Sequence, residues 1–406
     1  MSTSPTLVRP GADAAAPPAA PRTVRPELEP ARPPAPIRTL RKMSRDDLFD
    51  LVGAAVSSLS VALLLFGRLA PLRGPFGFVV VSYLLFIVLY ALLVSFHEGR
   101  PAVVDRVMSV LLGTTAVIAG LALLSVVSFT LWRGRDALAN SNLYTQDMSE
   151  AGPADPLSVG GIGHALVGTF VIMALSLVLT VPLGLTCAVF LNETRSRAGR
   201  LVRTIVDAMT ALPSILAGLF IFATWILILG FERSGLAAAI AVSIMMLPII
   251  IRSSDVVLRL VPGNLREAAL ALGASQWRTV WHVVLPTARS GLATSVILGM
   301  ARGLGETAPV LLTAGFTSTI NTNPIKGPMV SLPLATYEFV RSPQPALISR
   351  GFATAAVLMV VALVLSAVAR IIGGRPAGHL PPRQNRRLTA RSAKVAARFA
   401  PRPEVS

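Results

Sequence analysis

The chain has 406 residues, of which 53% are hydrophobic and only 14% are charged, and its formal net charge is +17. Several apolar stretches are long enough to cross the roughly 30 Å of bilayer hydrocarbon as helices, so the composition excludes an ordinary soluble protein. The positive charge does not indicate nucleic-acid binding, because sixteen of the 37 basic residues lie near the two ends of the sequence, before Asp47 or after Ile372. Basic tails of a membrane protein are expected to stay in the cytoplasm and to contact anionic membrane lipids.

The N-terminal segment, residues 1–45, is rich in Pro, Ala and Arg and shows no apolar periodicity. It buries too little apolar surface to offset the entropy of ordering, so we predict a disordered cytoplasmic tail. We expect no secretory signal peptide, because the first apolar stretch begins only near Leu48. Residues 376–406 are predicted to form a second basic cytoplasmic tail.

Eight apolar stretches of membrane-spanning length follow the first tail. They cover about residues 48–67, 76–96, 107–131, 164–191, 205–230, 234–251, 290–315 and 351–372. Arginines gather in the connections 192–204 and 252–289, which share the side of the two basic tails if the number of spans is even. We therefore predict an all-α integral membrane fold, with an N-terminal two-helix hairpin at 46–100 before a six-helix core at 105–375.

Proline and glycine occur inside several of the predicted core helices. They are Pro182, Gly184, Pro213, Gly218 and Pro248. Broken helices are tolerated in lipid where a cavity or neighbouring groups satisfy the freed backbone, so this clustering favours a translocation pathway. The alternative is that the small residues allow helices to pack closely.

The segment 264–286 is polar and helix-forming, and it interrupts the apolar sequence between the fourth and fifth core helices. We expect Asn264 to cap a short helix that ends at Gly273, and Ser275 to cap a second helix that Pro286 stops. Such an elbow suits docking into a partner's groove through its apolar side chains, although a helix lying on the lipid surface is the alternative. These side chains are Leu270, Leu272, Trp277, Val280 and Trp281.

Charged side chains stand within or at the end of two apolar stretches: Arg252 with Asp255, and Arg302 with Glu306. A charge at such depth costs about 2.5–3.5 kcal/mol on insertion scales, so it normally faces a cavity or a partner. Arginine suits an oxyanion, because its guanidinium group stays charged and offers paired donors. The alternatives are that Arg302 and Glu306 neutralise each other as an i,i+4 pair and that Arg252 is a positive-inside anchor.

The sequence Glu267-Ala268-Ala269, followed by Gly273, resembles the EAA motif of ABC-transporter permeases. In importers of that class the motif forms a coupling helix that lies in a groove of the ATPase. The resemblance therefore implies that Glu267, Ala268, Ala269 and Gly273 couple this chain to a separate ATPase, and that the core has the type I, MetI-like permease fold.

The stretch from Ala301 to Pro309 reads Ala-Arg-Gly-Leu-Gly-Glu-Thr-Ala-Pro and is similar to the signature of the PstA family of phosphate ABC permeases. Residues 247–255 resemble that family's preceding segment, and the resemblance covers roughly residues 105–372. It implies roles in phosphate translocation for Arg252, Asp255, Arg302 and Glu306. The N-terminal hairpin and the long tails are additions to the family pattern.

This resemblance implies the permease subunit of an importer that carries inorganic phosphate across the cytoplasmic membrane. It implies as partners a PstC-type permease, a dimer of PstB-type ATPases that use the ATP, and an extracytoplasmic phosphate-binding protein docked on residues 132–163 and 316–350. We expect neither enzyme activity nor a cofactor or metal site in this chain, because its sequence has no Gly-x-x-x-x-Gly-Lys-Ser/Thr loop and no metal-ligand spacing. The alternatives are a permease for sulfate, molybdate or another solute, and a membrane-anchored adaptor.

Overall fold

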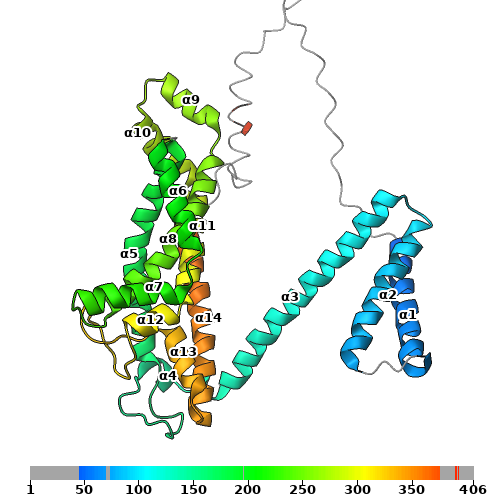
Figure 1. Cartoon of the computed structure of the whole chain (residues 1–406), viewed down its shortest axis with the longest axis horizontal. Helices are drawn as coiled ribbons and strands as arrows, with labels where there is room; N and C mark the ends of the chain where they lie inside the picture. Colours follow the sequence, from blue (N-terminus) through cyan, green and yellow to red (C-terminus); the bar gives the residue numbers. More distant parts are fainter. Residues whose placement is uncertain (1–44, 70–73, 195, 375–388, 391, 393–406) are drawn as a thin grey trace, which may run out of the picture. The chain divides into compact units, whose positions relative to one another are not determined.

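The computed structural model describes residues 45–69, 74–194, 196–374, 389–390 and 392, so the predicted tails lie almost entirely outside the described residues. The described part of the chain is helical and contains no strand, which confirms the predicted fold class. It divides into two compact units, residues 1–116 and 117–406 (Figure 1). Helix α3 (Arg100–Leu138) contributes residues to both units.

The first unit contains the predicted N-terminal hairpin. Its helices are α1 (Arg45–Leu64), extended by the π-helical turn η1 (Leu65–Leu69), and α2 (Pro75–Ser95), followed by the beginning of α3. Ala54, Tyr90 and Val94 form its small buried core. Arg106 of α3 binds both Asp47, at 2.7 Å, and Glu98, at 2.6 Å, so an ion-pair cluster ties α1 to the start of α3.

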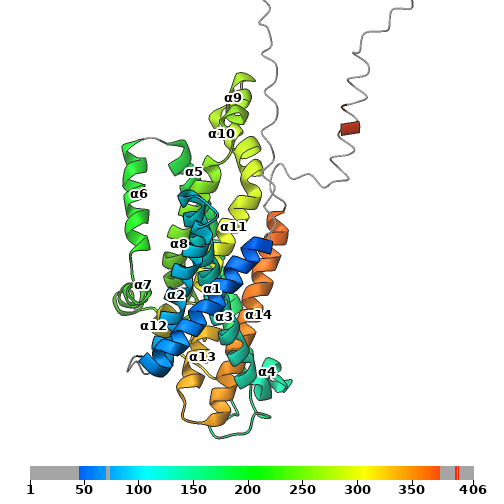
Figure 2. The same ribbon diagram turned by 90° about the vertical axis from the view of Figure 1, so that its right-hand side faces the viewer.

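Four long helices form the body of the second unit. They are α5 (Gly163–Glu193), α8 (Gly235–Arg259), α11 (Leu285–Leu304) and α14 (Pro345–Gly373). Helix α8 packs against α5 and α11, and α11 packs against α14 (Figures 1 and 2). A Cβ atom added at Gly184 or Gly299 would lie within 2.7 Å of Ile250 on α8. At Gly184 the small residue therefore serves close packing, the alternative to a pathway.

Shorter elements connect these helices. They are α4 (Asn142–Thr145), α6 (Arg197–Thr210), α7 (Ser214–Ile221), η2 (Phe222–Ile228), α9 (Gly263–Ala271), α10 (Gln276–Thr279), η3 (Val280–Val284), α12 (Ala308–Thr313) and α13 (Leu332–Arg341). Within the described residues, seven helices are long and apolar enough to cross a membrane. Helix α6 and the segment formed by α7 and η2 meet at a bend of 105°. They make an eighth span only if the two are counted as one.

Two predicted spans differ from the structure. The span predicted at 205–230 is broken, because Pro213 offers no backbone donor and disfavours helical backbone in the residue before it. The span predicted at 290–315 ends at Leu304, and α12 forms separately beyond Gly305. By contrast, α5 and α8 continue through Pro182 and Pro248.

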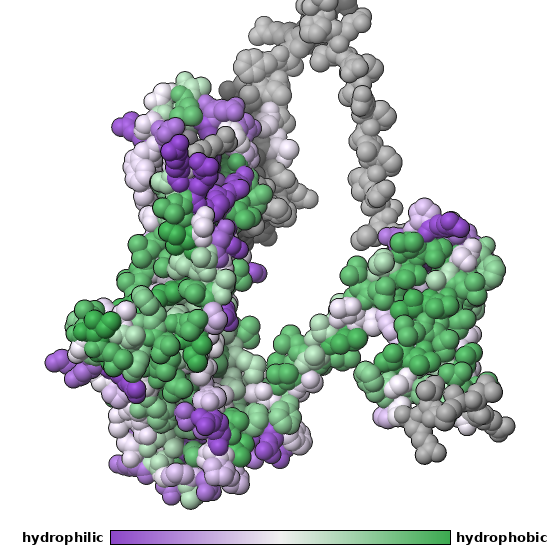
Figure 3. Space-filling view, viewed as in Figure 1, coloured by the Kyte–Doolittle hydropathy of each residue, from purple (hydrophilic) through white to green (hydrophobic). Residues whose placement is uncertain are grey.

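The two ends of the second unit carry different elements. Helices α9 and α10 lie at one end, whereas α4 and α13 lie at the other (Figures 1 and 2). The surface between these ends is hydrophobic, and hydrophilic side chains gather at the end that carries α9 (Figure 3). This distribution suits a unit whose middle faces lipid and whose ends face water. We call the end with α9 the coupling end and the end with α4 and α13 the loop end.

Candidate functional site

The predicted elbow is present at the coupling end. Helix α9 ends before Gly273, whose φ of +81° is a left-handed conformation that glycine adopts without steric cost. The hydroxyl of Ser275 then accepts a hydrogen bond from the backbone N–H of Arg278 and caps α10. Asn264 does not cap α9, because the helix already begins at Gly263. The sequence therefore predicted the bend correctly and placed the first cap wrongly.

The apolar side of the elbow is largely open. Leu272 is 89% exposed and Trp277 is 67% exposed, and the rings of Trp277 and Trp281 meet edge to face with centroids 5.6 Å apart. Glu267 and Ala268 are exposed, and Ala269 is half-buried. These positions are accessible to a partner subunit.

Two expectations about the second half of the elbow are wrong. Val280 is buried, because η3 turns it into the interior, so it cannot anchor a partner. Pro286 does not stop the second helix, because α10, η3 and α11 form one continuous span, Gln276–Leu304. Pro286 is the second residue of α11, directly after the π-helical turn η3, and the chain continues as a helix through it.

Arg266 attaches the elbow to the membrane helices. Its guanidinium group donates to Glu193 Oε1 at 2.8 Å and to Asn192 Oδ1 at 2.7 Å, both at the end of α5. It also donates to the carbonyl oxygen of Leu258 on α8 at 3.3 Å. A displacement of α9 therefore pulls directly on the ends of α5 and α8.

Asp255 is buried and binds two arginines. Its carboxylate accepts from Arg259, one helical turn along α8, at 2.8 Å, and from Arg203 of α6 at 3.4 Å. Removing a charge from water is costly unless it is paired, so these contacts account for a carboxylate at this depth. Asp255 thus joins α6 to α8 at the coupling end.

Arg252 and Arg302 each pair with a carboxylate. Arg252 donates to Asp207 of α6, and both side chains are half exposed. Arg302 lies 3.1 Å from Glu306, which is only 5% exposed, although the guanidinium group itself is half exposed. The predicted i,i+4 pair is therefore formed. Arg302 stands near the end of α11 and not well inside it, because the helix stops at Leu304.

The two arginines lie at different depths. Helices α8 and α11 run in opposite directions, and their contacts place Gly303 beside Met246 and Gly299 beside Ile250. Arg302 precedes Gly303, whereas Arg252 follows Met246 by six positions. In this antiparallel pairing Arg302 lies level with position 247, five residues before Arg252. At 1.5 Å per residue the two levels are about 7.5 Å apart along the helix axes, with Arg252 nearer the coupling end. The backbone positions of Arg302 and Arg252 therefore lie at successive levels of the α8–α11 pair.

The loop end is held together by backbone and side-chain hydrogen bonds. Asp147 accepts from the backbone N–H of Ile320 at 3.1 Å and from the Ser149 hydroxyl at 2.6 Å. The bond from Ser149 is the main reason that the pKa of Asp147 lies below its usual value. Arg350, in the first turns of α14, is 1% exposed and donates to the carbonyl oxygen of Val159 at 2.7 Å. Arg350 is the last position of the connection expected at 316–350, and the structure places it inside α14.

Comparison with known proteins places the chain in a family. Residues 180–377 match the family model described as "Binding-protein-dependent transport system inner membrane component". The chain is 37% identical over 274 residues to "Phosphate transport system permease protein PstA 1" of Mycobacterium tuberculosis H37Rv, covering 67% of this chain and 88% of the relative. It is 36% identical over 259 residues to PstA of Haemophilus influenzae, covering 63% and 89%. The chain belongs to the PstA family.

The aligned regions leave about a third of this PstA-family chain without a counterpart in those relatives. Among solved structures, an inward-facing MetNI methionine ABC transporter aligns with a TM-score of 0.40 and 21% identity, covering 52% of this chain and 91% of that one. Membership of the family and the helical structure agree with the fold class and the function class that the sequence predicted.

Sequence reasoning missed four charged residues of this PstA-family chain. They are Arg203, Asp207, Arg259 and Arg266. Arg259 and Arg266 carried a local signal, because each is close in sequence to a residue already selected. No local sequence pattern indicated Arg203 or Asp207, because α6 meets α8 only after the chain has bent at Pro213. The roles of Arg252, Asp255, Arg302 and Glu306 in translocation stay predictions.

Proposed function

We propose that this chain is the permease subunit of an ATP-driven importer of inorganic phosphate, and that phosphate passes Arg302 before Arg252. The observation that supports this path is the pair of half-exposed arginines on α11 and α8, at levels about 7.5 Å apart. The family membership supports the cargo, because the relatives are named as phosphate transport system permeases.

Half-exposed ion pairs suit a translocation path, because they contribute little stability and can exchange partners. Exposed pairs typically contribute about 0–1 kcal/mol. A phosphate oxygen that approaches Arg252 can therefore replace Asp207 as the acceptor at small cost, and one that approaches Arg302 can bind the exposed part of that side chain while Glu306 stays buried. Guanidinium groups bind phosphate through two parallel hydrogen bonds, which favours this exchange. When phosphate leaves, the carboxylate returns and the arginine keeps a partner.

Coupling to ATP hydrolysis takes place through the elbow formed by α9, Gly273 and α10. A dimer of PstB-type ATPases binds the exposed face that includes Glu267, Ala268, Ala269 and Leu272. Closure of that dimer moves α9, and Arg266 transmits the movement to α5 and α8 through Glu193, Asn192 and Leu258. ATP hydrolysis belongs to these partners, and the permease chain itself binds no cofactor.

The remaining partners follow from the two ends of the second unit. A PstC-type permease supplies the second half of the pathway, and an extracytoplasmic phosphate-binding protein docks at the loop end. The coupling end, α6 and both termini face the cytoplasm. The arginines of α6, α8 and α9 then lie on the side that the positive-inside rule requires.

The substitution Arg302→Gln tests the path. In the complete importer, reconstituted in liposomes with its binding protein, we expect phosphate uptake to fall about tenfold or more, since glutamine removes the charge-assisted contact of arginine with phosphate and such a loss typically costs over about 1.4 kcal/mol. The amounts of co-purified ATPase and partner permease should be unchanged. Arg289→Gln, which removes an exposed arginine from the first turns of the same helix, is the matched control.

Unchanged uptake in the Arg302→Gln importer would exclude Arg302 from the path. The cargo is tested separately by competition, because sulfate and molybdate are also oxyanions. Uptake that unlabelled sulfate blocks and unlabelled phosphate does not would contradict phosphate as the cargo while leaving the importer assignment in place.

A further inference from the structure

A hollow of about 610 Å³ opens at the coupling end. It lies between the end of α5, the beginning of α6, the end of α8 and the beginning of α9, and four arginines line it. Arg200 and Arg203 belong to α6, Arg259 to α8 and Arg266 to α9. The hollow therefore lies where α5, α6, α8 and α9 meet.

The arginines of this hollow outnumber the carboxylates that neutralise them. Asp255 pairs with Arg203 and Arg259, and Glu193 pairs with Arg266. Arg200 forms no ion pair within the described residues. Four positive charges thus face two negative ones, which leaves an excess of positive charge around the hollow.

Several guanidinium donors in the hollow have weak partners or none. Arg203 reaches Asp255 and the carbonyl oxygen of Leu191 only at 3.4 and 3.5 Å, which is at the limit of a hydrogen bond. The Nε atom of Arg266 is buried and has no hydrogen-bond partner. Because Arg203 and Arg259 bind the same oxygen of Asp255, their guanidinium groups lie close enough to bind one small anion.

We propose that this hollow binds a phosphate-class oxyanion from the cytoplasm and that its occupancy slows import. An anion held there would link α6, α8 and α9 through their arginines and oppose the movement of α9 that drives transport. The regulatory part rests on the proposed function, because the regulating ion is the imported one. The binding part rests only on the arginines and the hollow.

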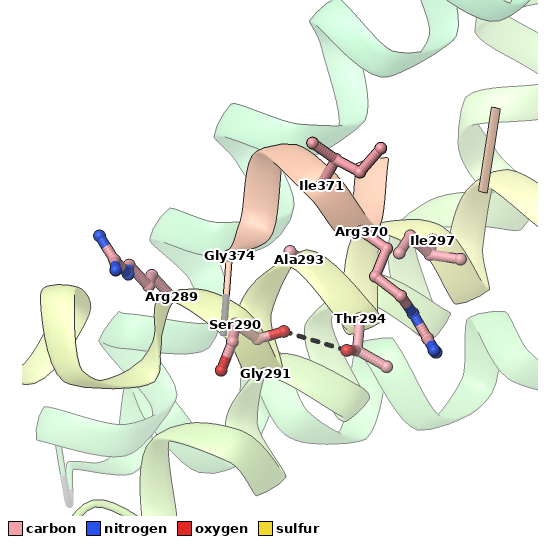
Figure 4. A pocket seen from close by; sticks show the side chains of 9 residues that line it. All are labelled: Arg289, Ser290, Gly291, Ala293, Thr294, Ile297, Arg370, Ile371 and Gly374. Carbon is pink, nitrogen blue, oxygen red and sulfur yellow. Dashed lines mark hydrogen bonds between the residues drawn. The ribbon is translucent and has the colours of Figure 1, made fainter. Parts of the chain in front are cut away.

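A second hollow at the coupling end also contains arginines and serves as a comparison for the hollow between α5, α6, α8 and α9. It is larger, about 930 Å³, and lies between α11 and α14. It also has two arginines, but Arg289 and Arg370 extend to opposite sides of it, with Ser290, Ala293 and Thr294 between them (Figure 4). These two arginines do not converge on one anion, so Arg289 serves as a control of equal charge.

Binding is tested by titrating inorganic phosphate into the complete detergent-solubilised importer, without ATP or binding protein, and measuring the heat released. We expect Arg200→Gln to weaken binding by about tenfold or more, as loss of a charge-assisted contact does. Arg289→Gln should leave the affinity unchanged. Binding should persist in Arg302→Gln, which separates this site from the translocation path. Absence of binding, or equal affinity in Arg200→Gln, would overturn the proposal.

Regulation is tested in liposomes that contain ATP and increasing unlabelled phosphate, with binding protein and labelled phosphate outside. Initial uptake by the unsubstituted importer should fall as internal phosphate rises, whereas uptake by Arg200→Gln should stay near its phosphate-free rate. If Arg200→Gln loses the ATPase during purification, and internal phosphate does not change uptake by the unsubstituted importer, the hollow binds a carboxylate of the ATPase and the proposal fails. If no importer variant transports phosphate but calorimetry still detects binding through Arg200, the proposed function fails and the binding site stands.

Discussion

The two ends of the second unit use arginine in opposite ways. At the coupling end, Arg203, Arg252 and Arg259 are about half exposed and bind carboxylates across α6 and α8. At the loop end, Arg350 is 1% exposed and donates to the carbonyl oxygen of Val159 and the sulfur of Met148. The first kind of contact can change partners at small cost, whereas the second is fixed by packing on every side.

Packing of the surrounding backbone agrees with this difference. A Cβ atom added at Gly161 or Gly168 of the loop end would lie 2.3 Å or less from a carbonyl oxygen, so the chain there has no room to adjust. At the coupling end only the elbow differs: a Cβ atom added at Gly263 or Gly273 would meet nothing within 4 Å, whereas one added at Gly291 or Gly373 in the adjoining membrane helices would lie 2.4 Å or less from a neighbouring side chain. We infer that the loop end offers a preformed surface to the binding protein, and that the coupling end carries the movement.

The largest expected effect comes from removing the buried arginine of the loop end. Arg350→Ala deletes a large buried side chain and leaves the Val159 carbonyl without its donor, so it should cost about 2–5 kcal/mol. Thermal unfolding of the assembled importer in detergent should begin more than about 5 °C lower, on a scale of roughly 2–4 °C per kcal/mol.

Arg341→Ala provides the comparison for this prediction. Arg341 is an exposed arginine of the same end that lies over the ring of Tyr337 at 5.0 Å. Its removal should shift the unfolding temperature by no more than about a degree, as exposed substitutions usually do. Equal shifts for Arg350→Ala and Arg341→Ala would show that burial does not distinguish the two ends.

A smaller effect on stability, with a larger effect on transport, is expected at Gly273. A β-branched residue in the left-handed conformation costs about 1–2 kcal/mol, so Gly273→Val should distort the bend between α9 and α10. Asparagine tolerates this conformation better, so Gly273→Asn should be milder. We expect Gly273→Val to lower phosphate imported per ATP hydrolysed several-fold, measured in liposomes, while the assembled importer unfolds within a few degrees of the unsubstituted one.

Gly263→Ala is the control, because Gly263 lies in α9 without the left-handed conformation and its Cβ position is free. Its transport ratio should be close to that of the unsubstituted importer. If valine at position 273 transports as efficiently as glycine, the elbow does not depend on its left-handed bend.

A structural feature could be predicted from the sequence where a few neighbouring residues determine it. Gly273 and Ser275 were correctly placed because a helix end and a cap depend on a few neighbouring residues. The apolar spans were mostly recognisable because hydropathy is summed along the chain. Proline gave no uniform signal, since the chain breaks at Pro213 but α8 continues through Pro248. Whether a proline breaks a helix depends on the packing around it.

The partners of the candidate charges could not be predicted in the same way. Asp255 was selected as a translocation residue, but its contact with Arg203 joins positions 52 apart in sequence. The burial of Arg350 likewise depends on residues about 190 positions earlier, in the loop between α4 and α5. Such pairings follow from the tertiary arrangement, and without it a charge near an apolar stretch could equally be a ligand, an anchor or a structural bond.

The smallest expected effect concerns the pH dependence of the loop end. Asp147 accepts hydrogen bonds from Ser149 and Ile320, and these bonds hold its pKa below the usual value. Because this pKa is lowered, the ionised carboxylate stabilises the folded loops at pH values above the unfolded-state pKa of about 3.9. This stabilisation is lost as the pH falls through the lower pKa that Asp147 has in the folded protein. Asp147→Asn should therefore lower the unfolding temperature slightly at pH 7 and less at pH 3.

Glu150→Gln, at an exposed neighbouring position, should show no such difference between pH 7 and pH 3. A destabilisation by Asp147→Asn that does not diminish on acidification would mean that the side chain acts through its shape and not through its charge.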